Sequence, residues 1–110
     1  MRNKTIARLA LPLLCTLLGT AAQAQGAGTK EALYVRTLAA SCANCHGTDG
    51  KAVAGSPVPS LAGLDKTYFV AQMAAFQSGA RPATVMHQLS KGFNDAQIQA
   101  LATYFAAQKK

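Results

Sequence analysis

Three residues near the middle of the chain have types and a spacing that can do chemistry. The stretch CANCH contains Cys42 and Cys45, with His46 directly after the second cysteine. Two thiols and an imidazole in this order are compatible with a zinc site, a redox-active disulfide or a covalently attached haem. Each possibility requires different partners elsewhere in the chain, so the remaining residues decide between them.

The rest of the chain offers little support for zinc or for a redox disulfide. Structural zinc usually takes four Cys or His ligands, often in two pairs, and after the N-terminal apolar run the only further candidate is the distant His87. Thiol oxidoreductases of the thioredoxin kind carry their Cys-x-x-Cys after a strand, and no segment here alternates like a strand. The residues therefore favour a haem, held by thioethers from Cys42 and Cys45 above a proximal His46.

The iron of such a haem takes a second axial ligand. A methionine thioether there gives a closed iron with a raised reduction potential. Met73 lies within an apolar helical stripe and is expected in the core, whereas Met86 lies in a connector that can cross the other haem face. We therefore expect Met86 to be the ligand. His87 is an alternative that would give a bis-histidine iron.

A ligand histidine usually donates a hydrogen bond from its other ring nitrogen, which fixes its tautomer and orientation. The segment PVPS, residues 57–60, follows the Cys-x-x-Cys-His motif and contains a suitable carbonyl at Pro59. We expect Pro59 to accept this bond from His46. The alternative is a proline that only stiffens a turn.

The segment that contains the motif predicts a helix followed by a loop. Residues 30–46 are rich in helix formers and free of Gly and Pro, and residues 47–60 are rich in both. Residues at helical spacing predict a buried stripe on this helix: Leu33, Thr37, Leu38, Cys42 and Cys45.

Two further main helices complete an all-α domain. The second is expected over residues 65–80, with Asp65 as its N-cap and Gly79 at its far end. The last begins after Asn94, where Gln97 stands at the position that a capping box requires. The connector between these helices contains Met86 and is expected to hold a short helical turn or two.

The first 24 residues have the pattern of a secretory signal: basic residues, a short apolar run and a small-x-small site ending at Ala24. We expect cleavage there, so that residues 25–110 form a mono-haem domain in the periplasm that does not span the membrane. The formal net charge of the whole chain is +7. Because the lysines after the leader are scattered and form no basic stripe, we do not expect nucleic-acid binding.

Taken together, these features resemble class I cytochromes c over essentially the whole exported chain. CANCH ends a helix, a Pro-containing loop follows, and a methionine precedes a closing helix with LATYF. The resemblance implies a small class I cytochrome c fold, with three main helices and loops around one covalent haem c and its iron. It assigns the family's roles as follows: Cys42 and Cys45 carry the haem, His46 and Met86 are the axial ligands, and Pro59 supports the histidine.

A narrower likeness concerns the function. The stretches CANCHGTDG, FQSGAR and ATVMHQLSKGFNDAQ resemble the cytochrome subunit of flavocytochrome c sulfide dehydrogenases, and nearly as closely one half of tandem di-haem cytochromes. The likeness implies an electron carrier rather than an enzyme, and a flavoprotein or other redox protein that docks at the haem edge. A free periplasmic shuttle to an oxidase or reductase is one alternative. An open-iron haem enzyme or gas sensor is another. His87 departs from the family pattern, which has a small residue after the methionine.

Overall fold

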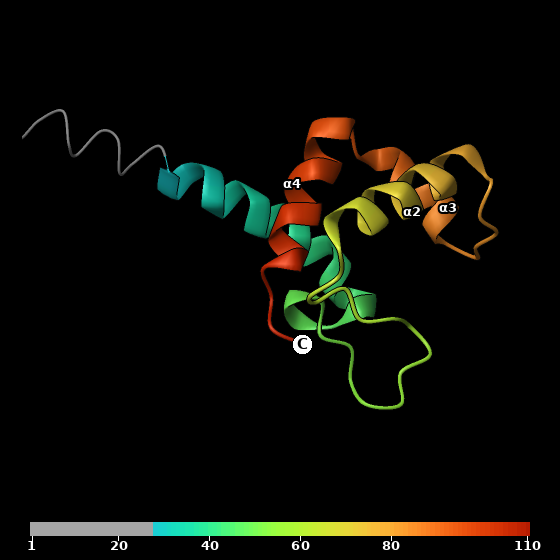
Figure 1. Cartoon of the computed structure of the whole chain (residues 1–110), viewed down its shortest axis with the longest axis horizontal. Helices are drawn as coiled ribbons and strands as arrows, with labels where there is room; N and C mark the ends of the chain where they lie inside the picture. Colours follow the sequence, from blue (N-terminus) through green and yellow to red (C-terminus); the bar gives the residue numbers. More distant parts are fainter. Residues whose placement is uncertain (1–27) are drawn as a thin grey trace, which may run out of the picture. The chain divides into compact units, whose positions relative to one another are not determined.

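The computed structural model describes residues 28–110, so the expected signal segment, residues 1–24, lies outside the described residues. The described residues belong to two units, which meet between Leu33 and Tyr34 in the chain. Residues 28–33 of the first unit are helical. The second unit contains, in chain order, a helix over residues 34–46, the short η1 (Thr48–Gly50), α2 (Lys66–Ser78), α3 (Met86–Leu89), η2 (Ser90–Gly92) and α4 (Asp95–Ala106) (Figure 1).

The all-α prediction is confirmed, since residues 28–110 contain helices, turns and loops but no strand. The connector before the last helix holds α3 and η2, in agreement with the helical turns expected there. None of the helices in this part of the chain combines the length and the apolar character needed to cross a bilayer.

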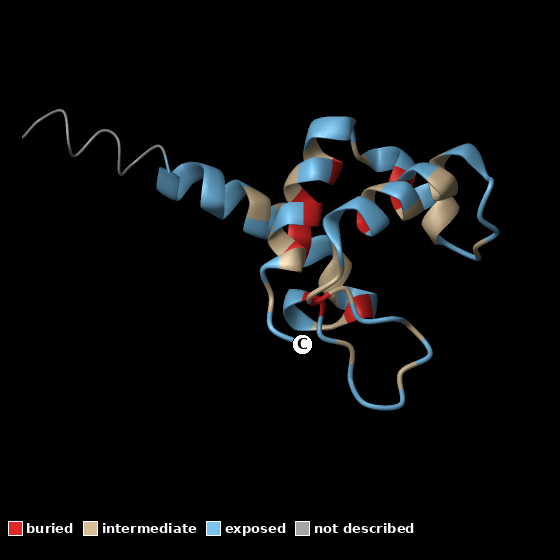
Figure 2. Cartoon of the chain, viewed as in Figure 1, coloured by how far each residue is buried: buried red, intermediate tan, exposed pale blue. Residues whose placement is uncertain are grey.

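The core of the second unit lies between α2, α4 and the helix over residues 34–46. Figure 2 shows buried residues on both α2 and α4, which pack against each other. At the centre, the rings of Phe69 and Phe105 lie 5.7 Å apart at a tilted angle, and Tyr104 meets Phe105 edge-on. Such aromatic pairs add stabilisation beyond the apolar area that they bury. The buried members of the cluster are Ala39, Phe69, Met73, Ile98, Leu101, Ala102 and Phe105.

The ends of α2 and α4 are fixed by the caps that the sequence predicts. The Asp65 side chain accepts from the Tyr68 N–H, and Gly79 closes α2 in the left-handed conformation with φ 79°. Asn94 and Gln97 form a reciprocal capping box at the start of α4. These bonds satisfy backbone groups that a helix terminus leaves unpaired.

The buried stripe expected on the first helix is wrong in part. Leu38 and Cys42 are half-buried, but Cys45 is exposed, and the one buried apolar residue of this helix within the cluster is Ala39. Leu33 and Thr37 are also exposed. The core therefore meets this helix through a narrow strip around a small residue, which allows close approach.

Candidate functional site

The three residues of the motif occupy the last turn of the helix over residues 34–46. Cys42 is half-buried and packs against the hydrophobic cluster, whereas Cys45 is exposed; both are free thiols. Burial raises the pKa of the Cys42 thiol, and a weaker effect of the Ser41 hydroxyl opposes the rise. Because positions three apart lie on the same side of a helix, both sulfurs are available to one flat partner.

His46 is held by the carbonyl that the sequence suggested. It is 9% exposed, and its Nδ1 lies 2.6 Å from the carbonyl oxygen of Pro59. Because a carbonyl can only accept, Nδ1 carries the proton and donates it. In the neutral ring the other nitrogen, Nε2, is then the one without a proton and is the nitrogen that can bind a metal.

The loop around Pro59 is anchored by the carbonyl of Gly50, which accepts three hydrogen bonds. The Ser60 hydroxyl donates to it at 2.7 Å, and the backbone N–H groups of Leu61 and Ala62 donate at 2.8 and 3.1 Å. Since these donors directly follow Pro59, they fix the carbonyl that faces His46. These three hydrogen bonds thus fix the loop on the proximal side of the site.

Gly50 itself can only be a glycine. Its φ is +77°, and a Cβ placed there would lie 2.8 Å from the Phe105 ring and 2.9 Å from the Leu61 side chain. The close approach locks the turn that follows His46 onto the C-terminal half of α4. The N–H of Gly63, further along the loop, donates to the Phe105 carbonyl at 2.8 Å and strengthens the same junction.

Asp49 and Tyr104 form a second tie between this turn and α4. The Tyr104 hydroxyl donates to the Asp49 carboxylate at 2.5 Å, and Asp49 has a φ of 54°, which Asp tolerates better than most residues. This hydrogen bond, followed by burial and the charge of Asp49, raises the pKa of Tyr104 against a smaller lowering effect of Arg36. The sequence reasoning missed the pair because its members are 55 positions apart.

Met86, Met73 and His87 occupy three different environments. Met86 is the first residue of α3, is half-buried, and packs against the cluster that also contacts Cys42. Met73 is 6% exposed within the core, so its expected core role is confirmed. His87 is half-buried, and its Nδ1 is a buried atom with no hydrogen-bond partner among the described residues. Of the two methionines within residues 28–110, Met73 is buried in the core and Met86 is only half-buried.

The same residues provide no set of ligands for a zinc ion. Within residues 28–110, no three His, Cys, Asp or Glu side chains gather closely enough to hold a metal ion. Two free thiols on one helix face, together with a buried imidazole whose Nε2 is unprotonated, instead suit a porphyrin that is attached through sulfur and ligated through nitrogen.

Comparison with known proteins also indicates a haem protein. Residues 29–105 match the family model described as "Cytochrome C oxidase, cbb3-type, subunit III". The cytochrome subunit of sulfide dehydrogenase from Chlorobaculum tepidum is 40% identical over 68 residues, which cover 62% of this chain and 60% of that protein. A thiosulfate dehydrogenase electron acceptor from Thiomonas intermedia is 42% identical over 71 residues, which cover 64% of this chain and 33% of the relative. The chain thus spans less than two thirds of both relatives.

A solved structure agrees with the fold. The cytochrome c4 of Acidithiobacillus ferrooxidans superposes with a TM-score of 0.56 at 36% sequence identity, over 60% of this chain and 37% of that one. The match to the family model extends from the first helix to Phe105 in the last turn of α4 and so includes the whole candidate site. The chain therefore belongs to this cytochrome c family, which implies a covalently bound haem c with its iron as the cofactor.

Proposed function

We propose that this chain is a one-electron carrier whose haem c is held by Cys42 and Cys45 and ligated by His46 and Met86. The observation that carries the proposal is the hydrogen bond from His46 Nδ1 to the Pro59 carbonyl. It fixes the ring and, in the neutral imidazole, selects the tautomer with a free Nε2 lone pair, which a proximal iron ligand requires. When bound, the haem supplies an iron that changes between its ferric and ferrous states by one electron.

The two cysteines fit the attachment of one haem. They lie one helical turn apart on the same side of the helix, so their sulfurs can each form a thioether with one edge of the same porphyrin. Cys42 is half-buried against the core and Cys45 is exposed. A haem attached through both sulfurs would therefore contact the core at Cys42 and lie near the surface at Cys45, where a redox partner would have access.

Met86 is the methionine best suited to the distal position. It begins α3 and packs against the same cluster as Cys42 without being fully enclosed. Its thioether would complete a six-coordinate iron and raise the reduction potential. His87 is the competing ligand, and its unpaired Nδ1 is the observation in its favour.

The ligation is tested by ultraviolet–visible spectroscopy of the haem-loaded protein. Ferric wild type should have a sulfur-to-iron charge-transfer band, and Met86→Ala should abolish it. Met73→Leu and His87→Ala should retain it, because neither removes the ligand. A band that survives in Met86→Ala but disappears in Met73→Leu would transfer the role to Met73. A spectrum without the band in wild type, together with rapid carbon monoxide binding to the ferrous form, would favour an open iron.

We further propose that the carrier works in the periplasm and accepts electrons from a flavin-containing sulfide dehydrogenase. The likeness to the cytochrome subunit of sulfide dehydrogenase supports this partner. The likeness to a thiosulfate dehydrogenase electron acceptor supports the alternative, a separate carrier that collects electrons from a dehydrogenase and delivers them to an oxidase or reductase. In both cases the chain binds no substrate of its own, so it acts as an electron-transfer component rather than as an enzyme.

Stopped-flow reduction distinguishes the two partners. A purified sulfide dehydrogenase flavoprotein with sulfide should reduce the ferric chain rapidly and co-elute with it on gel filtration. If the chain elutes alone and is reduced only slowly by this flavoprotein, the subunit assignment fails and the separate carrier stands.

A further inference from the structure

The side chain of Gln77 links α2 to the segment that carries Met86. Its Nε2 donates to the carbonyl oxygen of Ser90 at 2.9 Å and to that of Phe93 at 3.0 Å. These carbonyls lie at the two ends of the short turn between α3 and α4. One amide near the end of α2 therefore uses both of its N–H groups to hold this turn.

The backbone of Ser90 extends the link to Met86. Its N–H donates to the carbonyls of Met86 and Gln88 and thereby closes α3, while its own carbonyl accepts from Gln77. Ser90 is fully buried, so water cannot replace Gln77 as the donor to its carbonyl. Two successive hydrogen bonds thus connect Gln77 to the first residue of α3.

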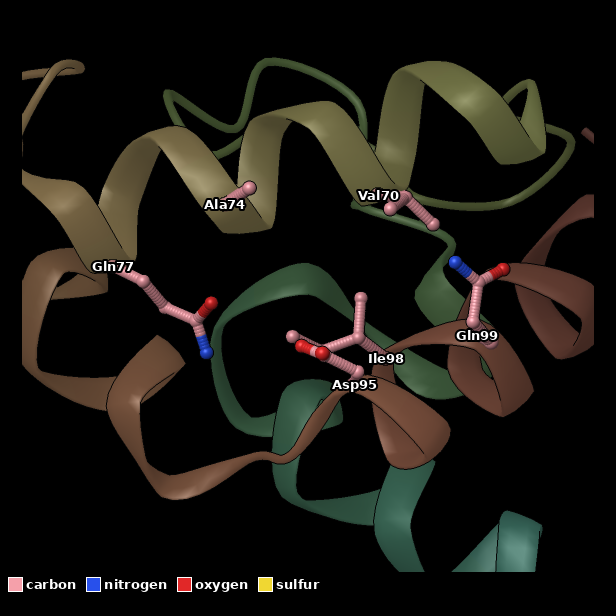
Figure 3. A pocket seen from close by; sticks show the side chains of 6 residues that line it. All are labelled: Val70, Ala74, Gln77, Asp95, Ile98 and Gln99. Carbon is pink, nitrogen blue, oxygen red and sulfur yellow. The ribbon is translucent and has the colours of Figure 1, made fainter.

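A pocket interrupts the packing between α2 and α4 beside Gln77. Gln77 lies at one end of a pocket of about 270 Å³ between the two helices (Figure 3). Opposed side chains that fill the space resist movement in a close-packed interior, and the pocket reduces this resistance between α2 and α4 at this point. The residues that line it are Val70, Ala74, Gln77, Asp95, Ile98 and Gln99. The hydrogen bonds of Gln77 therefore add to the packing of α3 and η2 on α2 and of Met86 and Phe93 on the hydrophobic cluster.

We propose that Gln77 is a positioning residue for the distal ligand: it holds α3 and η2 against α2 and so keeps Met86 closed on the iron. The inference rests on the proposed function, in which Met86 is that ligand. Gln77 acts through the backbone of Ser90 and Phe93 and does not itself contact Met86 by a hydrogen bond. Its loss removes the side-chain donor to the Phe93 carbonyl and leaves the Ser90 carbonyl with only the Phe93 N–H at 3.2 Å. Because Ser90 is fully buried, water can replace the lost donor to its carbonyl only if the segment moves outward.

Displacement of the distal ligand by imidazole measures this opening. Gln77→Met fills a similar volume without a donor, and Gln77→Glu has the same shape but an ionised carboxylate that only accepts. In the ferric haem-loaded protein, both variants should bind imidazole about tenfold more tightly than wild type, as followed by loss of the sulfur-to-iron band. Gln99→Met changes an exposed residue at the same pocket and should stay within about twofold of wild type, because Gln99 holds neither carbonyl.

Asn94→Ala is the control that separates a general loss of folding stability from the loss of the Gln77 hydrogen bonds. This variant weakens the cap of α4 but leaves both carbonyls paired with Gln77, so its imidazole affinity should match wild type even though it unfolds at lower temperature. Should Gln77→Met fail to fold, Gln77→Asn carries the same prediction, since its shorter side chain cannot reach both carbonyls.

The outcomes for the inference and for the proposed function are distinct. If ferric wild type lacks the sulfur-to-iron band, Met86 ligation itself fails. If wild type has the band but the Gln77 variants bind imidazole with wild-type affinity, the ligation stands and the role of Gln77 is overturned. If Asn94→Ala bound imidazole as tightly as the Gln77 variants do, the tighter binding would follow from a loss of global stability. The role of Gln77 would then also be overturned.

Discussion

His46 and Pro59, thirteen positions apart in the chain, are joined by a hydrogen bond of 2.6 Å from the imidazole Nδ1 to the backbone carbonyl. The bond does not depend on the side chain of residue 59, but proline limits the backbone there to a narrow range of φ. A stiff loop therefore holds the carbonyl against the imidazole. Loosening that loop should change the reduction potential of the haem-loaded protein.

Pro59→Gly should raise the reduction potential of the haem-loaded protein. A more mobile carbonyl accepts less strongly, which makes His46 a less basic ligand and removes stabilisation from the ferric state. A hydrogen bond worth about 1 kcal/mol corresponds to roughly 40 mV for one electron, so a rise of that order or smaller is expected. Spectroelectrochemical titration measures it. Pro57→Gly, in the same loop but without a bond to His46, is the control and should leave the potential unchanged.

Gly50→Ala should destabilise the protein far more than Gly55→Ala. Both glycines have φ near +80°, so both substitutions carry a backbone cost of about 1–2 kcal/mol. Only at Gly50 would the new Cβ also collide with Phe105 and Leu61, whereas nothing lies within 4 Å at Gly55. Overpacking should add about 1–3 kcal/mol at Gly50. Guanidinium unfolding gives both free energies, and equal losses would contradict the close approach.

Tyr104→Phe should reduce the fall in stability at alkaline pH. The pKa of Tyr104 is raised in the folded protein, so the folded state holds the phenol proton more tightly than the unfolded chain does. This stabilisation is fully present below the ordinary phenol pKa of about 10 and is lost as the pH rises through the folded pKa. The wild-type stability curve should therefore decline above about pH 10 more steeply than that of the variant.

The same variant should also lose about 1 kcal/mol at neutral pH, where the bond to Asp49 is intact. Tyr68→Phe, which changes an exposed tyrosine on α2, is the control. Urea unfolding at stepped pH values measures both effects. If both variants follow the wild-type alkaline slope, the Asp49–Tyr104 bond has no role in it.

Asn94→Ala should lower the free energy of unfolding by about 1 kcal/mol, because the side chain satisfies the Gln97 N–H at the start of α4. For a domain of this size the midpoint of thermal unfolding should fall by about 4–8 °C. Circular dichroism during heating measures the change. Asn94→Ser retains an oxygen acceptor and should remain close to wild type; an equal loss in both variants would show that the amide itself matters.

The caps were predictable from the sequence because their partners are local. Asp65 and Tyr68, or Asn94 and Gln97, lie within one helical turn, and residue type alone indicates the bond. The buried stripe on the first helix was harder to predict. Helical spacing groups Cys42 with Cys45, but the helix contacts the core through a strip narrow enough that Cys45 falls outside it. Ala39, a residue whose small side chain gives little hydrophobic signal, lies at its centre.

The contacts that shape the candidate site were not predictable, because each joins distant positions. Gly50 was assigned to a loop from its composition, but nothing nearby reveals that Phe105 will pack against it. Gln77 is an ordinary polar residue in a helical sequence. Its role follows only once α3 and η2 lie against α2, where its amide meets two carbonyls.

The two halves of the site pack against one hydrophobic cluster but are held by different hydrogen bonds. The turn after His46 is tied to Tyr104 and Phe105 near the end of α4, whereas the segment with Met86 is tied to Gln77 before α4 begins. Segments held by different hydrogen bonds can open as separate cooperative units. Native-state hydrogen exchange then measures a different free energy of opening for each segment. We expect amides of η2 to exchange through a smaller opening than those around Gly50, so that the protein exposes its distal coordination site transiently while its proximal side remains intact.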